Sequence, residues 1–170
     1  SRILGKVAIK ESYDVKVSEV HGMSQRGGSV VTYVKYGDKV YSPIIDRGEA
    51  DLILAFEMLE AMRALPYLKK GGKMIANTQK MNPMPVITGA MEYPENIEEK
   101  LSAKINLQAV DALSLAEKAG TIKAVNVVLI GLLAKSMDVD KNVWIDVIKE
   151  TVPEKFLDVN IKAFELGYEL

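Results

Sequence analysis

The sequence predicts an α/β fold with three layers (α/β/α), a mixed, mainly parallel sheet and a helical C-terminal part. Two short apolar runs, residues 52–56 and 73–77, flank a stretch of helix formers, as neighbouring parallel strands do. Helix-like segments then follow one another from residue 111 to the end of the chain. Since 170 residues is a usual size for one domain, we expect a single domain over residues 1–170.

The N-terminal third is predicted to contain a helix and several strands. Residues 2–10 have the apolar spacing of a helix already in progress. Because such a helix normally follows a strand and a turn, we expect an upstream strand and glycine-rich loop in the native protein. Residues 14–20 alternate with the period of a strand. Residues 29–36 are β-rich, and a Gly-Asp pair at 37–38 predicts a hairpin with residues 39–45.

The central segment has the pattern of a strand–helix–strand unit. Residues 52–56 form a continuous apolar run, residues 58–65 are helix formers, and Pro66 ends that helix. Residues 73–77 form the second apolar run, which predicts a strand parallel to the first. The three prolines and one glycine between residues 78 and 94 predict a long irregular loop.

The remainder of the chain is predicted to be mainly helical. The expected elements are a short helix at 95–103, an ambiguous strand at 105–110, and helices at 111–119, 126–136, 140–150 and 153–165. The apolar stretch 125–134 has about half of the roughly 20 residues needed to cross a bilayer, so it is interpreted as a buried helix.

Composition excludes several classes of protein. The 22 basic and 23 acidic residues nearly cancel, which argues against binding to nucleic acid or an anionic membrane. The chain has no cysteine and a single histidine, so it cannot hold an iron–sulfur cluster, and we expect no metal site of its own. Any redox chemistry must therefore be completed by a partner. Lacking cysteine and a recognisable leader, the chain is expected in the cytoplasm.

Ligands of open α/β sheets bind beyond the carboxyl ends of the strands, which selects candidate positions. The strand ends deliver residues 19–21, residues 56–57 and residues 77–78, and these would face one crevice if all three strands are parallel. Glu57 and Glu60 are assigned to stabilising the start of the 58–65 helix, because negative charge is favourable there.

Residues 19–29 are the most unusual segment, with three glycines, the only histidine, an arginine, a glutamine and two hydroxyls. Glycines let free backbone N–H groups form an anion-binding nest, and Arg26 adds a positive fork suited to a carboxylate or phosphate. The candidates for contact with substrate, coenzyme A or a partner are Glu19, His21, Gly22, Ser24, Gln25, Arg26, Gly27, Gly28 and Asn77.

Structural interpretations of the same segment stay open. In these interpretations Gly27 and Gly28 do no more than shape a turn, and Arg26 pairs with Glu19 or another carboxylate. His21 can act as a general acid or base, or it can be structural, and no catalytic residue is assigned. Met81 and Met84 are interpreted as loop packing or partner contact. The sequence has no G-x-x-x-x-G-K-[ST], G-x-S-x-G or H-E-x-x-H motif.

Two long runs carry a family resemblance. EVHGMSQRGGSVVTYVKYGDKVYSPII at residues 19–45 and GEADLILAFEMLEAMRALPYLKKGGKMIANT at residues 48–78 resemble the gamma-type domain of ferredoxin-dependent 2-oxoacid oxidoreductases. Within that family they are most similar to the small (beta) subunits that act on indolepyruvate. The resemblance implies that the family's glycine-rich G-x-G-G-Q-G loop lies upstream of residue 1 in the native protein.

The resemblance implies a role in the coenzyme A-dependent oxidative decarboxylation of an arylpyruvate such as indolepyruvate, with electrons passed to ferredoxin. It implies that thiamine diphosphate and [4Fe–4S] clusters are held by a large (alpha) subunit, and that this chain binds no cofactor and is inactive alone. Two alternatives stay open. One is a stand-alone nucleotide or coenzyme A binding module, and the other is a structural assembly subunit whose 78–94 loop grips a neighbour.

Overall fold

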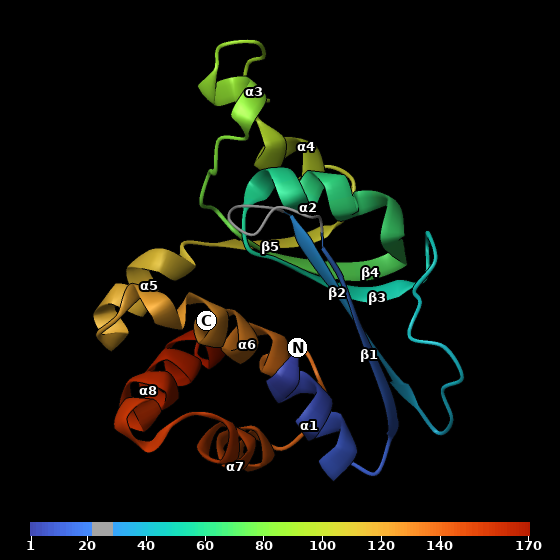
Figure 1. The fold of residues 1–170 in the computed structure, drawn as a ribbon, viewed down its shortest axis with the longest axis vertical. Coiled ribbons are helices and arrows are strands. Elements are labelled where there is room, and N and C mark those ends of the chain that lie inside the picture. The colour runs from blue at the N-terminus through green and yellow to red at the C-terminus, as the bar shows by residue number, and fades with distance from the viewer. Residues whose placement is uncertain (22–28) are drawn as a thin grey trace. The chain divides into compact units, whose positions relative to one another are not determined.

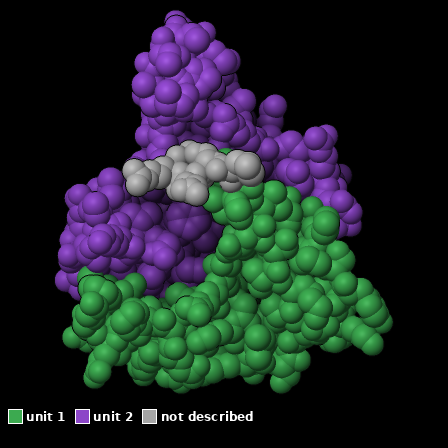
Figure 2. Space-filling view, viewed as in Figure 1, with its two compact units in different colours: residues 1–45, 137–161 green, residues 46–136, 162–170 purple. Residues whose placement is uncertain are grey.

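The computed structural model describes residues 1–21 and 29–170, and it confirms the α/β class with a helical C-terminal region (Figure 1). The chain divides into two compact units, which Figure 2 shows in different colours. Unit 1 comprises residues 1–45 and 137–161, and unit 2 comprises residues 46–136 and 162–170. Each unit has its own sheet, an antiparallel strand pair in unit 1 and a parallel three-stranded sheet in unit 2.

Unit 1 packs helices beside a two-stranded antiparallel sheet. Its main elements are α1 (Arg2–Lys10), β1 (Asp14–His21), β2 (Val30–Gly37), α7 (Lys141–Thr151) and the 3-10 turn η3 (Glu154–Phe156). α1 lies where the sequence predicts it, and it packs against α7 with an ion pair of 2.7 Å between Lys10 Nζ and Glu150 Oε1. β1 and β2 pair from Asp14 opposite Gly37 to His21 opposite Val30.

The predicted hairpin between residues 29–36 and 39–45 is wrong. β2 forms at the expected place, but its partner is β1, and residues 38–49 are described without a strand. Side chains satisfy backbone groups there instead. The Val40 N–H donates to Asp14 Oδ2 at 2.9 Å, and Lys35 Nζ donates to the Ile44 carbonyl at 3.1 Å. The Val40 bond is the main reason that the pKa of Asp14 lies below its ordinary value.

Unit 2 contains the predicted strand–helix–strand unit. Its sheet has the order β3-β4-β5, and both strand pairs are parallel, as predicted for residues 52–56 and 73–77. The elements of this unit before the helical region are β3 (Ala50–Ala55), α2 (Met58–Ala64), η1 (Leu65–Tyr67), β4 (Leu68–Asn77), α3 (Met84–Ile87), α4 (Ile97–Ser102) and β5 (Asn106–Val110).

Helices cover both faces of the parallel sheet. Figure 1 shows α2 and α4 over one face and α6 (Val125–Lys135) on the other. Met74 and Ala76 of β4 join the apolar cluster beneath α2 and α4, whose other members are Ala55, Met58, Leu59, Ala61, Ile97 and Leu101. This core fixes the ends of the strands, and therefore the starting points of the loops that follow them.

Two glycines in unit 2 permit close contact between α6 and α8 (Leu157–Tyr168). A Cβ atom added to Gly131 would lie 2.2 Å from the Phe164 carbonyl oxygen, and one added to Gly167 would lie 2.0 Å from the Val128 carbonyl oxygen. Both positions therefore require glycine. α6 is buried on nearly all sides, as predicted from its composition, and α5 (Ala112–Ala119) precedes it. In residues 1–21 and 29–170 no helix is long and apolar enough to span a membrane.

Several boundaries differ from the prediction. β4 begins at Leu68, so Gly71 and Gly72 lie inside the strand rather than before it. Gly71 has a φ of 81°, and the register shifts between Ala50 and Leu52, which identifies a bulge that glycine tolerates. The predicted 78–94 loop is largely irregular but contains the single turn α3.

Candidate functional site

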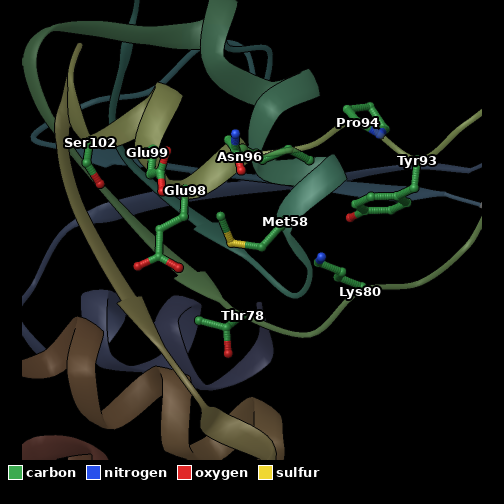
Figure 3. Close-up of a pocket in the computed structure, with 10 residues that line it drawn as sticks. Met58, Thr78, Lys80, Tyr93, Pro94, Asn96, Glu98, Glu99 and Ser102 are labelled. Atoms are coloured by element: carbon green, nitrogen blue, oxygen red, sulfur yellow. The ribbon is translucent and has the colours of Figure 1, made fainter.

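A pocket of about 500 Å³ lies at the carboxyl edge of the parallel sheet in unit 2 (Figure 3). Met58 begins α2 directly after β3, while Thr78 and Lys80 follow β4. The rest of the lining comes from the segment before α4 and from α4 itself: Tyr93, Pro94, Asn96, Ile97, Glu98, Glu99 and Ser102. The position beyond the strand ends agrees with the general rule for open α/β sheets.

The side chain of Asn77 links all three strand ends at this edge. Its Nδ2 donates to the Phe56 carbonyl after β3 at 3.2 Å and to Gln79 Oε1 at 3.3 Å. Its Oδ1 accepts from the Ala112 N–H after β5 at 3.1 Å. Asn77 is fully buried, and a buried amide is stable only when its polar atoms are paired in this way. The three bonds fix the spacing of the loops that leave the sheet.

Glu57 and Tyr93 form a second, partly buried contact beside the pocket. Glu57 is buried and accepts from the N–H groups of Leu59 at 3.0 Å and Glu60 at 2.6 Å, which confirms its predicted role at the start of α2. The Tyr93 hydroxyl donates to Glu57 Oε2 at 3.3 Å. Desolvation, followed by the Glu57 charge, raises the pKa of Tyr93 above its ordinary value, so this hydroxyl stays a donor at neutral pH.

The charged groups of the pocket have mixed signs. Lys80 Nζ lies 5.7 Å from the centre of the Tyr93 ring, a cation–π contact. Glu98 and Glu99 supply two carboxylates, and in the view of Figure 3 the Glu98 carboxylate and the Lys80 amine lie on opposite sides of Met58. Two carboxylates beside one amine do not favour a polyphosphate, because that ligand is recognised by an excess of cations. The pocket offers hydroxyls and an amide instead.

Comparison with known proteins decides the family. The family model for pyruvate ferredoxin/flavodoxin oxidoreductase matches residues 1–170. The chain belongs to this family. One family relative, the indolepyruvate oxidoreductase subunit IorB of Thermococcus kodakarensis, is 43% identical over 175 residues, which cover 98% of this chain and 86% of the relative.

Solved structures of the family have the same fold. The gamma subunit of a keto/oxoacid ferredoxin oxidoreductase from Geobacter sulfurreducens superimposes with a TM-score of 0.69 at 22% identity, covering 98% of this chain and 86% of that chain. The 2-oxoglutarate:ferredoxin oxidoreductase of Magnetococcus marinus, solved with 2-oxoglutarate, coenzyme A and succinyl-CoA bound, gives 0.64 at 16% identity, covering 98% of this chain and 27% of that chain. At these identities the likeness concerns the fold alone.

The structure describes three of the predicted site residues of this family member. Glu19 and His21 are exposed on β1, opposite Thr32 and Val30 of β2, and Asn77 is buried in the contact described above. The other candidates lie outside the described residues: Gly22, Ser24, Gln25, Arg26, Gly27 and Gly28. A role of any of the nine in ligand or partner contact stays a prediction.

The strand-end rule located part of the site. The convergence of residues 19–21 with residues 56–57 and 77–78 was conditional on parallel strands, and β1 instead pairs antiparallel with β2 in a separate sheet. Residues 56–57 and 77–78 do converge, because β3 and β4 are parallel neighbours. In the described part of the chain no three histidine, cysteine or acidic side chains are grouped to hold a metal ion.

Sequence reasoning missed Lys80, Tyr93 and Ser102. Lys80 follows a buried strand by three residues, which was a usable signal, whereas Tyr93 lies in a loop whose path the sequence does not specify. Ser102 is the last residue of α4, and its place beside the strand ends depends on packing of Ile97 and Leu101 into the core.

The Asn77 contact generates a stability prediction. Replacing Asn77 with Asp puts a carboxylate oxygen opposite the Phe56 carbonyl, so we expect the free energy of unfolding to fall by about 2–4 kcal/mol. Urea unfolding at neutral pH measures the change. Asn126→Asp is the matched control, because Asn126 is exposed in the first turn of α6, where the substitution should change stability by less than about 0.5 kcal/mol. Equal effects of the two substitutions would contradict the structural role of Asn77.

Proposed function

We propose that this chain is the small subunit of an indolepyruvate:ferredoxin oxidoreductase. In the proposed reaction the carboxylate of an arylpyruvate leaves as carbon dioxide, the remaining acyl group forms a thioester with coenzyme A, and the electrons reduce ferredoxin. The observation that carries the proposal is the 43% identity to an indolepyruvate oxidoreductase subunit over nearly the whole chain.

The proposal divides the chemistry between two chains. The sequence contains no cysteine, and iron–sulfur clusters are held by cysteine thiolates, so the [4Fe–4S] clusters are assigned to a large (alpha) subunit. Thiamine diphosphate is assigned to the same subunit. This assignment is supported by the charges of the 500 Å³ pocket, where Glu98 and Glu99 outnumber Lys80 and disfavour a diphosphate.

The contribution of this chain is proposed to lie at the exposed end of β1. Glu19 and His21 lead directly into the glycine-rich segment 22–28, which contains Arg26. A guanidinium binds a carboxylate or phosphate through paired hydrogen bonds, so Arg26 is proposed to orient the anionic substrate or coenzyme A. Such positioning accelerates a reaction by holding the reactants in a productive geometry.

A stand-alone coenzyme A or nucleotide binding module is the second candidate, favoured by the glycines of segment 22–28. Calorimetric titration of the isolated chain with coenzyme A separates the two candidates. Tight binding without a partner favours the binding module, whereas binding that requires the large subunit favours the oxidoreductase.

The proposed function makes two predictions, of which the first concerns reconstitution. We expect the isolated chain to show no arylpyruvate-dependent reduction of ferredoxin or a redox dye, because it has no cysteine with which to hold an iron–sulfur cluster. Mixing it with its purified large subunit under anaerobic conditions should restore coenzyme A-dependent reduction. Full turnover by the isolated chain would contradict the division of labour, and a mixture without turnover would contradict the proposed function.

The second prediction concerns Arg26. Replacement by alanine should lower kcat/KM of the reconstituted enzyme by about 10-fold to 100-fold, since a hydrogen bond to a charged group is worth about 1.5–3 kcal/mol. The thermal midpoint of the free chain should stay unchanged. Arg47→Ala is the control, because Arg47 is exposed and lies outside the glycine-rich segment. A large fall in the thermal midpoint of the Arg26 variant, with unchanged kcat/KM, would identify a structural role instead.

A further inference from the structure

The segment between Lys80 and Glu92 has an unusual composition. Its eleven residues, MNPMPVITGAM at 81–91, include no charged side chain, although 26% of the whole chain is charged. Four of its large apolar side chains are between 58% and 66% exposed: Met81, Met84, Ile87 and Met91. We call residues 81–91 the Met protrusion, because Figures 1 and 2 show it standing out from unit 2.

The Met protrusion has no core of its own, since none of its residues is buried. Backbone hydrogen bonds nevertheless give it a defined shape. The Ile87 N–H donates to the Pro83 carbonyl at 3.1 Å, the Thr88 N–H to the Met84 carbonyl at 2.9 Å, and the Met91 N–H to the Pro85 carbonyl at 3.0 Å. The two prolines fix φ and restrict the unfolded chain as well. The apolar side chains are therefore presented on an ordered turn.

These properties match the centre of a protein–protein interface. Burying an apolar side chain in an interface stabilises the complex by about 25 cal/mol for each Å² of apolar surface removed from water. An exposed apolar patch of several side chains marks an interaction site, and interface centres are enriched in methionine and depleted of charge. An ordered segment also loses little conformational entropy on binding. Lys80 and Glu92 at its two ends supply the polar rim of such an interface.

We propose that the Met protrusion inserts into an uncharged, apolar groove on the large subunit. This inference rests on the proposed function, which requires a partner chain, and it adds the surface through which that partner is held. Charge complementarity favours the large subunit over a second copy of this chain. A convex uncharged segment binds best in an uncharged groove. The pocket in unit 2 of a second copy is lined in part by Lys80, Glu98 and Glu99, so it is a poor site for the Met protrusion.

The hollow in unit 1 fits the protrusion no better. It measures about 460 Å³ and is lined in part by Arg2 and Lys6. An apolar insertion would remove these charged side chains from water, which is unfavourable. A contact between the protrusion of one copy and a hollow of the next is also heterologous, and such contacts build rings or filaments rather than a closed pair.

The test measures binding of the full-length chain to its purified large subunit. The variant Met84→Glu/Ile87→Glu places two carboxylates on exposed positions of the protrusion, so the free chain should keep its circular dichroism spectrum and thermal midpoint. We expect the Kd for the large subunit to rise at least about 100-fold, because two apolar anchors would be replaced by charges that must be desolvated. The matched control is Ile9→Glu/Ile122→Glu, whose original side chains are 62% and 57% exposed elsewhere. The control should change Kd by less than about threefold.

Several outcomes would overturn the inference. If the wild-type chain and the large subunit form an active complex, and the protrusion variant binds equally well, the proposed function survives and the docking surface is wrong. If the control weakens binding as much as the variant, the effect is not specific to the protrusion. Self-association of the free wild-type chain that the variant abolishes, seen by sedimentation velocity, would assign the protrusion to a second copy. If the wild-type chain does not bind the large subunit, the proposed function fails and the inference fails with it.

Discussion

The carboxyl edge of the parallel sheet depends on a single buried amide. Asn77 accepts from the backbone after β5 and donates to the backbone after β3, so one side chain fixes three chain segments that are far apart in sequence. A buried polar group of this kind is unfavourable unless all of its partners are in place, which makes the arrangement specific. Thr78 adds a backbone bond of 2.9 Å to the Val110 carbonyl beside it.

Further bonds at this edge join the segments that leave the sheet. The backbone carbonyl of Gln79 accepts from the Met58 N–H at 3.2 Å, which joins the start of α2 to the segment that leaves β4. Lys80 then lies over the Tyr93 ring, and Tyr93 donates to buried Glu57. The Met protrusion leaves from and returns to this bonded base. Its exposed apolar side chains are therefore held on a rigid support, as a docking element requires.

Sequence reasoning located the elements whose stabilisation is local or repetitive. The apolar runs around Ile53 and Ile75 predicted parallel strands, because strands buried on both faces need continuous apolar sequence. The pairing of β1 with β2 was missed, because residues 39–45 also look extended in sequence. Their backbone is instead bonded to Asp14 and Lys35. Such side-chain bonds depend on tertiary contacts, which cannot be predicted from the local sequence pattern.

The same limit applies to the candidate site. The strand-end rule identified Asn77 and Thr78, but the burial of the Asn77 amide follows only from the simultaneous positions of Phe56 and Ala112. The glycine-rich segment 22–28 was recognised from composition and family resemblance, and it lies outside the described residues. The absence of charge from residues 81–91 was readable in the sequence, whereas the exposure of its methionines was not.

The central claim is that this chain works in complex with a large subunit, and that the Met protrusion through which it binds is already ordered in the free chain. Hydrogen–deuterium exchange of the full-length chain, alone and bound to its large subunit, tests it most directly. The account predicts that the Ala112 amide, which is bonded to Asn77, is protected in both states, and that the amides of residues 81–91 are more strongly protected in the complex than in the free chain. Unchanged exchange of residues 81–91 on formation of an active complex would contradict it.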